Sequence, residues 1–317
     1  MSIFTRASSN PILIPRDLWW ESRGVFNPGV IAWGEKDVVM VYRAVGSDGI
    51  SRFGLATSRD GIGFDRRDYP LYEASYGDWA GRLGVEDSRL TVVEDVLYIT
   101  FTKVSLEVAT HPRLSWETAP FRLRSWLARF PDLKCVEEVG PVLSERNTKD
   151  LVLFPERIEG SFVALIREYP SIQLVTSTDL RSWTDPQTVL QPIPGTWEAE
   201  RVGAGPPPLR WGRNWLMLYH ANAYLRFPGN ERLYRMGLAV LDGVDPSRVL
   251  YRHPESIFEP EAPYEIQGPV GSVVFGTALI DRGELFRLYY GAADGVIGVA
   301  DVSADALNAL LPTTLRR

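Results

Sequence analysis

The feature of this sequence that most limits its possible folds is a pair of short apolar runs that recurs five times. The second run of each pair ends in an aromatic or aliphatic residue followed by a polar one, at 38–43, 96–102, 162–167, 215–220 and 285–291. A turn and an earlier apolar run precede each of these, at 29–33, 89–93, 151–158, 208–211 and 272–280. Hairpins that follow one another with turn residues between them predict an all-β protein.

The spacing of the five copies distinguishes among all-β architectures. The equivalent residues Tyr42, Phe101, Ile166, Tyr219 and Tyr290 lie 53 to 71 residues apart. A third strand follows in two copies, at 54–60 and 174–179. A period of this length accommodates the four strands of a propeller blade. We therefore expect a five-bladed β-propeller that occupies residues 1–317 as a single domain, with a short helix at 304–311.

The composition argues against several kinds of binding partner and indicates the compartment of the protein. The net charge of −6 argues against nucleic acid and against an anionic membrane surface. The single cysteine, Cys135, excludes an internal disulfide and fits a reducing compartment. Residues 1–15 lack the pattern of a signal peptide, and no apolar run approaches membrane-spanning length. We expect a cytoplasmic protein that binds neither nucleic acid nor membrane.

The segment 84–91 (GVEDSRLT) places two carboxylates at the start of a run that is predicted to be a buried strand. Charges are costly to bury unless they are paired or needed for function. Consecutive residues of a strand point to opposite faces, so Glu86 and Asp87 are expected to have different roles. One would pair with Arg82 or Arg89 as scaffold, while the other would face a cavity.

Polar residues occupy comparable positions in all five copies, and the inner strands of a propeller line its central channel. We therefore expect these side chains to converge near the axis. They are Asn27, Glu86, Asp87, Lys149, Asp150, Arg201 and Glu265 before the earlier runs, and Arg43, Lys103, Arg167, His220 and Asp294 after the second runs. Lys149, Arg167 and Arg201 come from two consecutive copies of an acidic chain, as does His220. Clustered cations repel one another unless an anion lies among them, so an anion site is expected here.

A carboxylate opposite a cationic cluster favours acid catalysis with an anionic co-substrate. An inverting glycosidase needs a second carboxylate to activate water from the opposite face of the sugar. Orthophosphate is already an anionic nucleophile and needs a cationic seat instead, to which Arg can offer bidentate contacts. Asp87 opposite the cationic cluster meets that requirement, and we expect no second carboxylate at the seat. Candidates to stack on sugar rings are Trp19, Trp20, Tyr219 and Tyr290.

The ordered motifs of the chain resemble those of glycoside hydrolase family 130, the β-mannoside phosphorylases, which are five-bladed propellers. The resemblance covers nearly the whole length and is specific as an ordered set. Its motifs are 26–29 (FNPG), 42–44 (YRA), 58–61 (SRDG), 85–89 (VEDSR), 149–150 (KD), 153–156 (LFPE), 202–208 (VGAGPPP), 218–220 (LYH), 237–242 (GLAVLD) and 289–294 (YYGAAD).

This resemblance implies inverting phosphorolysis of β-mannosides by orthophosphate, which gives α-mannose 1-phosphate. It implies that Asp87 is the general acid and acts on the glycosidic oxygen through the 3-hydroxyl of the mannosyl residue. The implied phosphate-binding residues are Lys149, Arg167, Arg201, His220 and Tyr234, and those that hold the mannosyl ring are Asn27, Arg43 and Asp294. Orthophosphate is the co-substrate, and neither a metal nor another cofactor is implied.

The chain departs from the family pattern at three places. Ser88 stands where the family usually has Pro after the acid, which should leave the acid in position. Lys149 stands where the family commonly has Arg, and Arg201 stands where it commonly has Lys. The charge at each position is kept, while the side chain able to make a bidentate contact moves from position 149 to position 201. The segment 105–122 departs most and is a candidate acceptor-side loop.

Two other functions stay open. An inverting β-mannoside hydrolase would need a base, for which Glu198, Glu200 or Glu156 are candidates unless they pair with Arg201 or Arg157. A non-catalytic carbohydrate-binding propeller is disfavoured by Asp87, because binding alone gains little from an acid. The linkage (β-1,2 or β-1,4), the leaving sugar and the oligomeric state also stay open. The helix at 304–311 and the pair Trp19 and Trp20 could form an interface in a homo-oligomer or close the propeller.

Overall fold

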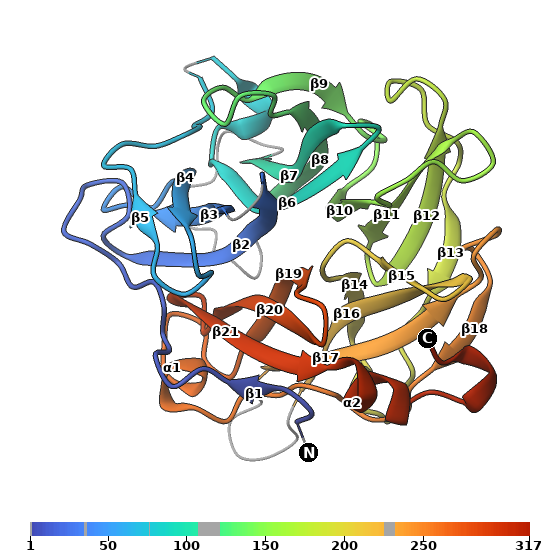
Figure 1. Cartoon of the computed structure of the whole chain (residues 1–317). Coiled ribbons are helices and arrows are strands. Elements are labelled where there is room, and N and C mark those ends of the chain that lie inside the picture. The colour runs from blue at the N-terminus through green and yellow to red at the C-terminus, as the bar shows by residue number, and fades with distance from the viewer. Residues whose placement is uncertain (1, 35–36, 76, 107–120, 225–231) are drawn as a thin grey trace.

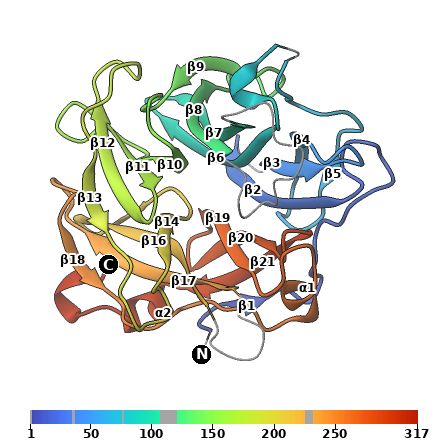
Figure 2. The same ribbon diagram turned by 180° about the vertical axis from the view of Figure 1, so that it is seen from behind.

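The strands of this chain form five antiparallel sheets arranged in a ring, as the computed structural model shows (Figure 1). The structure describes residues 2–34, 37–75, 77–106, 121–224 and 232–317. Seen from behind, the same five sheets surround the centre of the ring (Figure 2). The predicted all-β, five-bladed propeller is confirmed.

Blades I, II and III each consist of four strands that follow one another in the chain. Blade I contains β2 (Gly24–Trp33), β3 (Asp37–Val45), β4 (Ser51–Ser58) and β5 (Asp65–Arg66). Blade II contains β6 (Val85–Val93), β7 (Val96–Leu106), β8 (Phe121–Arg129) and β9 (Glu137–Pro141). Blade III contains β10 (Thr148–Leu153), β11 (Phe162–Glu168), β12 (Ser171–Ser177) and β13 (Gln187–Leu190).

Blades IV and V differ from the first three in the origin of their strands: blade IV has an additional inner strand, and blade V includes a strand from the N-terminal segment. In blade IV, β14 (Arg201–Ala204) and β15 (Leu209–Trp211) both pair with β16 (Asn214–Tyr224), which continues to β17 (Arg232–Leu241) and β18 (Val249–Arg252). Blade V contains β19 (Val274–Asp281), β20 (Leu285–Ala292), β21 (Val296–Ser303) and, at its outer edge, β1 (Thr5–Arg6). Thr5 pairs with Asp301 of β21, so the N-terminal strand closes the ring.

The helices are short. The predicted helix at 304–311 is α2 (Ala304–Ala309), and its Leu307 packs in the hydrophobic core of blades IV and V. The others are η1 (Trp79–Gly81), α1 (Pro263–Ile266) and η2 (Thr313–Leu315), of which none was predicted. Among the described residues, no helix has the length and apolar character that crossing a membrane would require.

The hydrophobic core lies between neighbouring blades. One cluster joins Val41 and Leu55 of blade I to Leu97 and Ile99 of blade II, and comparable clusters join the other blades. The middle strands are therefore buried on both faces, as the burial of 38–42 in β3 illustrates. Strands buried on both faces read as continuous apolar runs rather than as alternating ones. This is the physical reason for the recurring apolar runs in the sequence.

A β-bulge interrupts the inner strand of each of the first three blades. The register shifts between Phe26 and Gly29 in β2, and the same irregularity occurs in β6 and β10. A residue with positive φ lies at each bulge: Asn27 (47°), Asp87 (56°) and Asp150 (55°). An extra residue at a bulge breaks the alternation of side chains along a strand. The three bulges thus redirect polar side chains at equivalent points of consecutive blades.

Three blades share a buried contact between a tyrosine and a glutamate. Each tyrosine lies on the second strand and donates a hydrogen bond of 2.7 Å, from Tyr42 to Glu21, from Tyr219 to Glu198 and from Tyr290 to Glu265. Glycines on the next strand allow the rings to lie flat, since a Cβ on Gly54 would come within 2.2 Å of Tyr42. These contacts fasten the segments that lead into the inner strands. The tyrosines are therefore core residues.

Candidate active site

A cavity of about 900 Å³ opens at the end of the propeller where the inner strands begin. Its walls come from all five blades: Asn27 and Arg43 from blade I, Glu86 and Asp87 from blade II, Lys149 and Arg167 from blade III, Arg201 and Tyr234 from blade IV, and Phe275 and Asp294 from blade V. The expectation that polar residues of successive copies converge is met by these lining residues. Each of these polar side chains lies near the end of a strand or at a β-bulge, and this position directs it into the cavity.

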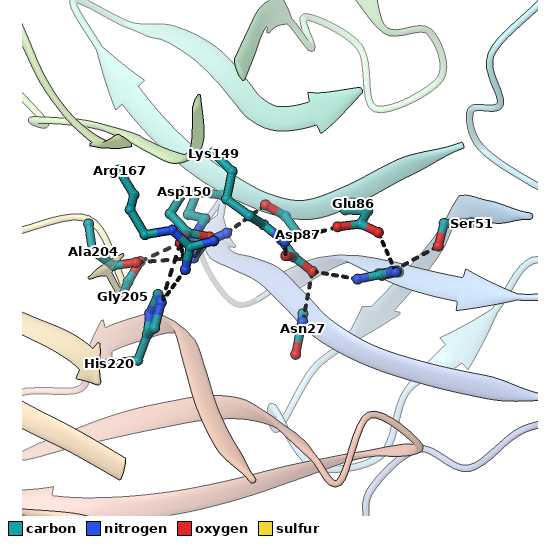
Figure 3. Close-up of polar contacts among 12 residues, drawn as sticks. Asn27, Ser51, Glu86, Asp87, Lys149, Asp150, Arg167, Ala204, Gly205 and His220 are labelled. Atoms are coloured by element: carbon teal, nitrogen blue, oxygen red, sulfur yellow. Dashed lines mark hydrogen bonds and ion pairs between the residues drawn. The ribbon is translucent and has the colours of Figure 1, made fainter. Parts of the chain in front are cut away.

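Asp87 lies at the centre of the polar contacts in the cavity (Figure 3). Its Oδ1 atom accepts hydrogen bonds from Asn27 Nδ2 at 2.7 Å and from Arg43 Nη1 at 3.2 Å. Its Oδ2 atom lies 2.7 Å from Nζ of Lys149. Asp87 is 3% exposed, so these partners replace most of its contact with water.

Glu86 shares two of these partners, which corrects the sequence-based expectation that the two carboxylates face opposite ways. Lys149 Nζ lies 2.9 Å from Glu86 Oε2, and Arg43 Nη2 donates to Glu86 Oε1 at 2.6 Å. The bulge after Glu86 and the positive φ of Asp87 turn both side chains toward the same cations. Glu86 lines the cavity, as expected for the set near the axis, but the family resemblance implied no role for it.

The charges around Asp87 decide its protonation in the free protein. Burial opposes ionisation, but Lys149, Arg43 and Arg89 outweigh it and hold the pKa of Asp87 below its usual range. A general acid needs a pKa closer to the operating pH. Asp87 is therefore a carboxylate, without a proton to donate, while the cavity holds only the protein's own charges.

A second buried carboxylate, Asp150, lies behind the cavity. Its Oδ2 atom is 2.9 Å from Arg167 Nη1 and 3.3 Å from His220 Nε2, and its Oδ1 atom is 3.6 Å from Arg89 Nη2. Arg89 in turn donates to the backbone carbonyls of Asp87, Ala204 and Gly205. One guanidinium thus joins the inner strands of blades II and IV to the inner strand of blade III.

His220 does not line the cavity, which corrects its predicted position among the groups facing the anion site. The residue is completely buried, and Phe275 packs on its ring at a centroid distance of 4.2 Å. Burial lowers the pKa of His220 to about 4, although Asp150 partly opposes this. The imidazole is therefore neutral at physiological pH. It contacts Arg167 and Asp150 and lies behind the guanidinium that faces the cavity.

The other predicted phosphate ligands line the cavity together. Lys149 of β10 is directly paired with Arg167 of β11, so their side chains are neighbours on one face. Arg201 begins β14, and its guanidinium lies 5.3 Å from the centre of the Tyr234 ring. The cavity therefore has a wall with three basic side chains in a chain that is acidic overall. Their binding of phosphate stays a prediction.

The predicted sugar-holding residues Asn27, Arg43 and Asp294 surround Asp87 on the opposite side. Asn27 lies over β20, because a Cβ on Gly291 would come within 2.0 Å of its Oδ1 atom. Asp294 follows β20 with a φ of 51°. Burial raises the pKa of Asp294 to about 6; Arg43 opposes this shift and Asp87 adds to it. Their role in holding a sugar ring stays a prediction.

Two of the residues expected near the axis lie elsewhere. Lys103 Nζ is 2.7 Å from both Asp78 and Glu138, because β7 continues beyond Lys103 and carries it away from the strand end. Glu265 lies in α1, where Arg6 and Tyr290 bind its carboxylate. The expectation was wrong for both residues. Lys103 lies within a strand that is longer than the sequence pattern indicated, and Glu265 lies in a helix that was not predicted.

The aromatic lining also differs from the sequence-based candidates. Trp20 is completely buried against Tyr42, and Trp19 is exposed with Arg52 stacked on its ring. The described aromatic residues that line the cavity are Phe26, Phe121, Tyr224, Tyr234 and Phe275. Of the predicted acceptor-side loop at 105–122, residues 107–120 lie outside the described residues, while Phe121 lines the cavity.

None of the three candidate bases for a hydrolase is among the lining residues. Glu198 binds Tyr219 and Arg252, and Glu156 binds Arg210, so their partners differ from those that the sequence suggested. Glu200 is also outside the lining set. Within the described part of the chain, no group of three or more His, Cys, Asp or Glu side chains is placed to hold a metal ion.

Comparisons with known proteins find a matching family model and similar relatives. The family model described as β-1,4-mannooligosaccharide phosphorylase, glycoside hydrolase family 130, matches residues 10–311. A 1,2-β-oligomannan phosphorylase of Thermoanaerobacter sp. (strain X514) is 37% identical over 303 residues, which cover 93% of this chain and 95% of that protein. A β-1,2-mannobiose phosphorylase of the same strain is 34% identical, covering 95% of this chain and 97% of that protein.

A solved structure shares the fold over nearly its whole length. It is the complex of a β-1,2-mannobiose phosphorylase from Listeria innocua with β-1,2-mannobiose. The TM-score is 0.82 at 26% identity, and the match covers 97% of this chain and 99% of that one.

Proposed function

This chain belongs to glycoside hydrolase family 130, and from that premise we propose that it is an inverting β-mannoside phosphorylase. Orthophosphate cleaves a terminal β-mannosyl residue from a mannooligosaccharide, and the products are α-mannose 1-phosphate and a shortened sugar. The observation that carries the proposal is the cavity in which Asp87 contacts Lys149 and shares the space with the basic side chains of Arg167 and Arg201. A general acid and an anionic nucleophile need such an arrangement.

The chemistry assigns each side of the cavity a task. Asn27, Arg43 and Asp294 hold the mannosyl ring, whose 3-hydroxyl relays a proton from Asp87 to the glycosidic oxygen. Arg167, Arg201 and Tyr234 hold phosphate below the anomeric carbon, with Lys149 between the two groups. One phosphate oxygen forms a bond to the anomeric carbon while the bond to the leaving oxygen breaks. A single displacement inverts the configuration, so a β-mannoside gives the α-phosphate.

We propose β-1,2-linked mannosides as the preferred substrates. Both Thermoanaerobacter relatives are named for β-1,2 linkages, whereas the description of the family model names β-1,4 linkages. Aromatic side chains at the cavity wall, among them Phe26 and Tyr224, offer apolar surface to the leaving sugar. The shortened sugar is released after each cycle.

The test is one incubation with β-1,2-mannobiose and one with β-1,4-mannobiose, each with and without orthophosphate. Proton NMR of the first product should show α-mannose 1-phosphate, formed only with phosphate and faster from the β-1,2 substrate. Free mannose formed equally well without phosphate would identify a hydrolase. A β-phosphate would contradict the single displacement, and binding without turnover would identify a lectin-like propeller.

A further inference from the structure

Lys149 occupies a position between the carboxylates of the cavity and its basic wall. Its Nζ atom lies 2.7 Å from Asp87 Oδ2 and 2.9 Å from Glu86 Oε2. An ammonium group has three donors, and the two carboxylates engage two of them. Lys149 also lines the cavity, directly paired across the ladder with Arg167. The same ammonium group can therefore reach toward an anion that Arg167 holds.

None of the other described groups around Asp87 contacts both its carboxylate and the basic wall as Lys149 does. They are Asn27 on β2, Arg43 on β3, Glu86 and Arg89 on β6, Asp150 on β10 and Asp294 after β20. Arg43 divides its contacts between Asp87 and Glu86, and Arg89 donates to the backbone carbonyl of Asp87. Among the cations that the structure describes, Lys149 makes the shortest contact with the Asp87 carboxylate, at 2.7 Å.

We propose that Lys149 is shared between Asp87 and the incoming phosphate, so that phosphate binding is the event that allows Asp87 to take up the proton it later donates. This inference rests on the proposed phosphorylase function. It makes Lys149 the residue that determines specificity for phosphate over water.

The electrostatic reason has two parts. A phosphate dianion among Lys149, Arg167 and Arg201 competes with Asp87 for the ammonium group, and it also adds negative charge near the carboxylate. Both effects increase the affinity of the carboxylate for a proton. The proton comes from solvent when phosphate binds, moves to the leaving oxygen as the glycosidic bond breaks, and leaves Asp87 ionised again.

The consequence is that Asp87 cannot act as a general acid for hydrolysis when no phosphate is bound. Without an anion at the basic wall, Asp87 stays ionised through its contacts with Lys149 and Arg43. Attack by water on the anomeric carbon is then slow, because no group donates a proton to the leaving oxygen. The free enzyme thereby disfavours hydrolysis, although it holds a suitable carboxyl group in place.

Calorimetric titration with sulfate tests the inference without turnover. Sulfate mimics the phosphate dianion and does not titrate near neutral pH, so any proton taken up belongs to the protein. Titrations at about pH 6 in buffers of different ionisation enthalpy measure that uptake. Asp294 has a pKa of about 6 and takes up part of a proton itself, so the titrations are made in Asp294→Asn. In this variant we expect a substantial fraction of one proton per sulfate bound. Adding Asp87→Asn should abolish the uptake, while adding Glu86→Gln should retain most of it.

Three results would overturn the inference. They are the absence of proton uptake in Asp294→Asn, an undiminished uptake when Asp87→Asn is added to that variant, and the failure of both sulfate and orthophosphate to bind. If Asp87→Asn does not fold, Lys149→Gln provides the same test, because it should weaken sulfate binding and reduce the uptake. Full uptake in Lys149→Gln would contradict the sharing of the ammonium group.

The rate of hydrolysis without phosphate provides an independent measurement. Lys149→Gln should increase the rate at which free mannose is released, since each unit of increase in the pKa of Asp87 raises its protonated fraction about tenfold. Arg167→Gln is the matched control, because Arg167 contacts Asp150 and is not among the hydrogen-bonding partners of Asp87. It should lose phosphorolysis while its rate of hydrolysis stays at the wild-type level. Equal rates of hydrolysis in the two variants would count against the inference.

The two measurements separate this inference from the proposed function. A protein that cleaves no mannoside but takes up a proton at Asp87 with sulfate would refute the phosphorylase and keep the coupling. A phosphorylase without proton uptake would keep the function and refute the coupling.

Discussion

The Oδ2 atom of Asp150 lies 2.9 Å from Nη1 of Arg167, and this contact fixes the guanidinium that faces the cavity. The same carboxylate lies 3.6 Å from Arg89, whose side chain is completely buried. One buried anion thus compensates two guanidinium groups, one structural and one at the cavity wall. We therefore expect Asp150 to contribute both to stability and to the proposed binding of phosphate.

Asp150→Asn should destabilise the protein by about 3–5 kcal/mol, because it leaves the buried Arg89 without its anion. Urea unfolding at pH 7 measures the loss. Arg167 and His220 outweigh the burial of Asp150 and hold its pKa well below its usual range, so its stabilising effect is present at neutral pH. The effect is lost as the pH falls through the folded-state pKa, and the difference between variant and wild type should shrink in acid. The exposed control Asp185→Asn should change stability by less than about 0.5 kcal/mol.

Asp87→Asn should retain the fold and reduce kcat by about 10²–10⁴-fold, the usual contribution of general acid catalysis. The amide has nearly the same shape but cannot supply an acidic proton. Mannosides with an activated aryl leaving group need no protonation and should restore turnover in the variant. Steady-state kinetics on both substrates, with circular dichroism as the folding control, measure the effect. Near-normal cleavage of mannobiose would make Asp87 a scaffold residue and direct attention to Glu86.

Arg167→Ala should raise the KM for phosphate far more than the KM for the mannoside. It removes a charge-assisted contact with the anion, which is worth about 1.5–3 kcal/mol. His220→Ala should raise the same constant by less, because His220 acts through Asp150 and Arg167 from behind the wall. Initial rates over a grid of both substrates separate the two constants, with Arg210→Ala as the surface control. Equal effects on both constants would assign Arg167 to sugar binding or to the blade.

The rate of cleavage should rise as the pH increases through about 6, because the pKa of Asp294 is raised to about that value by burial. Below this pH the carboxyl group is protonated and accepts sugar hydroxyls less well. Asp294→Asn should lower kcat/KM for the mannoside and remove this limb of the pH profile. The profile of kcat/KM between about pH 5 and 8 is the measurement. An unchanged acidic limb in the variant would assign it to another group. His220 does not contribute there, because burial lowers its pKa to about 4.

The sequence by itself determined the blade repeat and most of the polar side chains that line the cavity. Strands buried on both faces must be continuously apolar, and this requirement leaves a pattern that can be read directly, as at 38–43 and 162–167. Residues at equivalent points of a closed ring must converge, which placed Asn27, Asp87 and Lys149 correctly. These conclusions depend on local patterns and on the symmetry of the repeat.

Only the tertiary structure decided how the charges are shared. Alternation along a strand separates Glu86 from Asp87, but a bulge with positive φ at Asp87 brings both onto Lys149. The burial of His220 depends on Phe275 from another blade. Bulges, strand lengths and contacts between blades arise from packing between segments far apart in the chain, so no local pattern encodes them. The protonation state of Asp87 therefore follows from the assembled cavity and cannot be read from the motif that contains it.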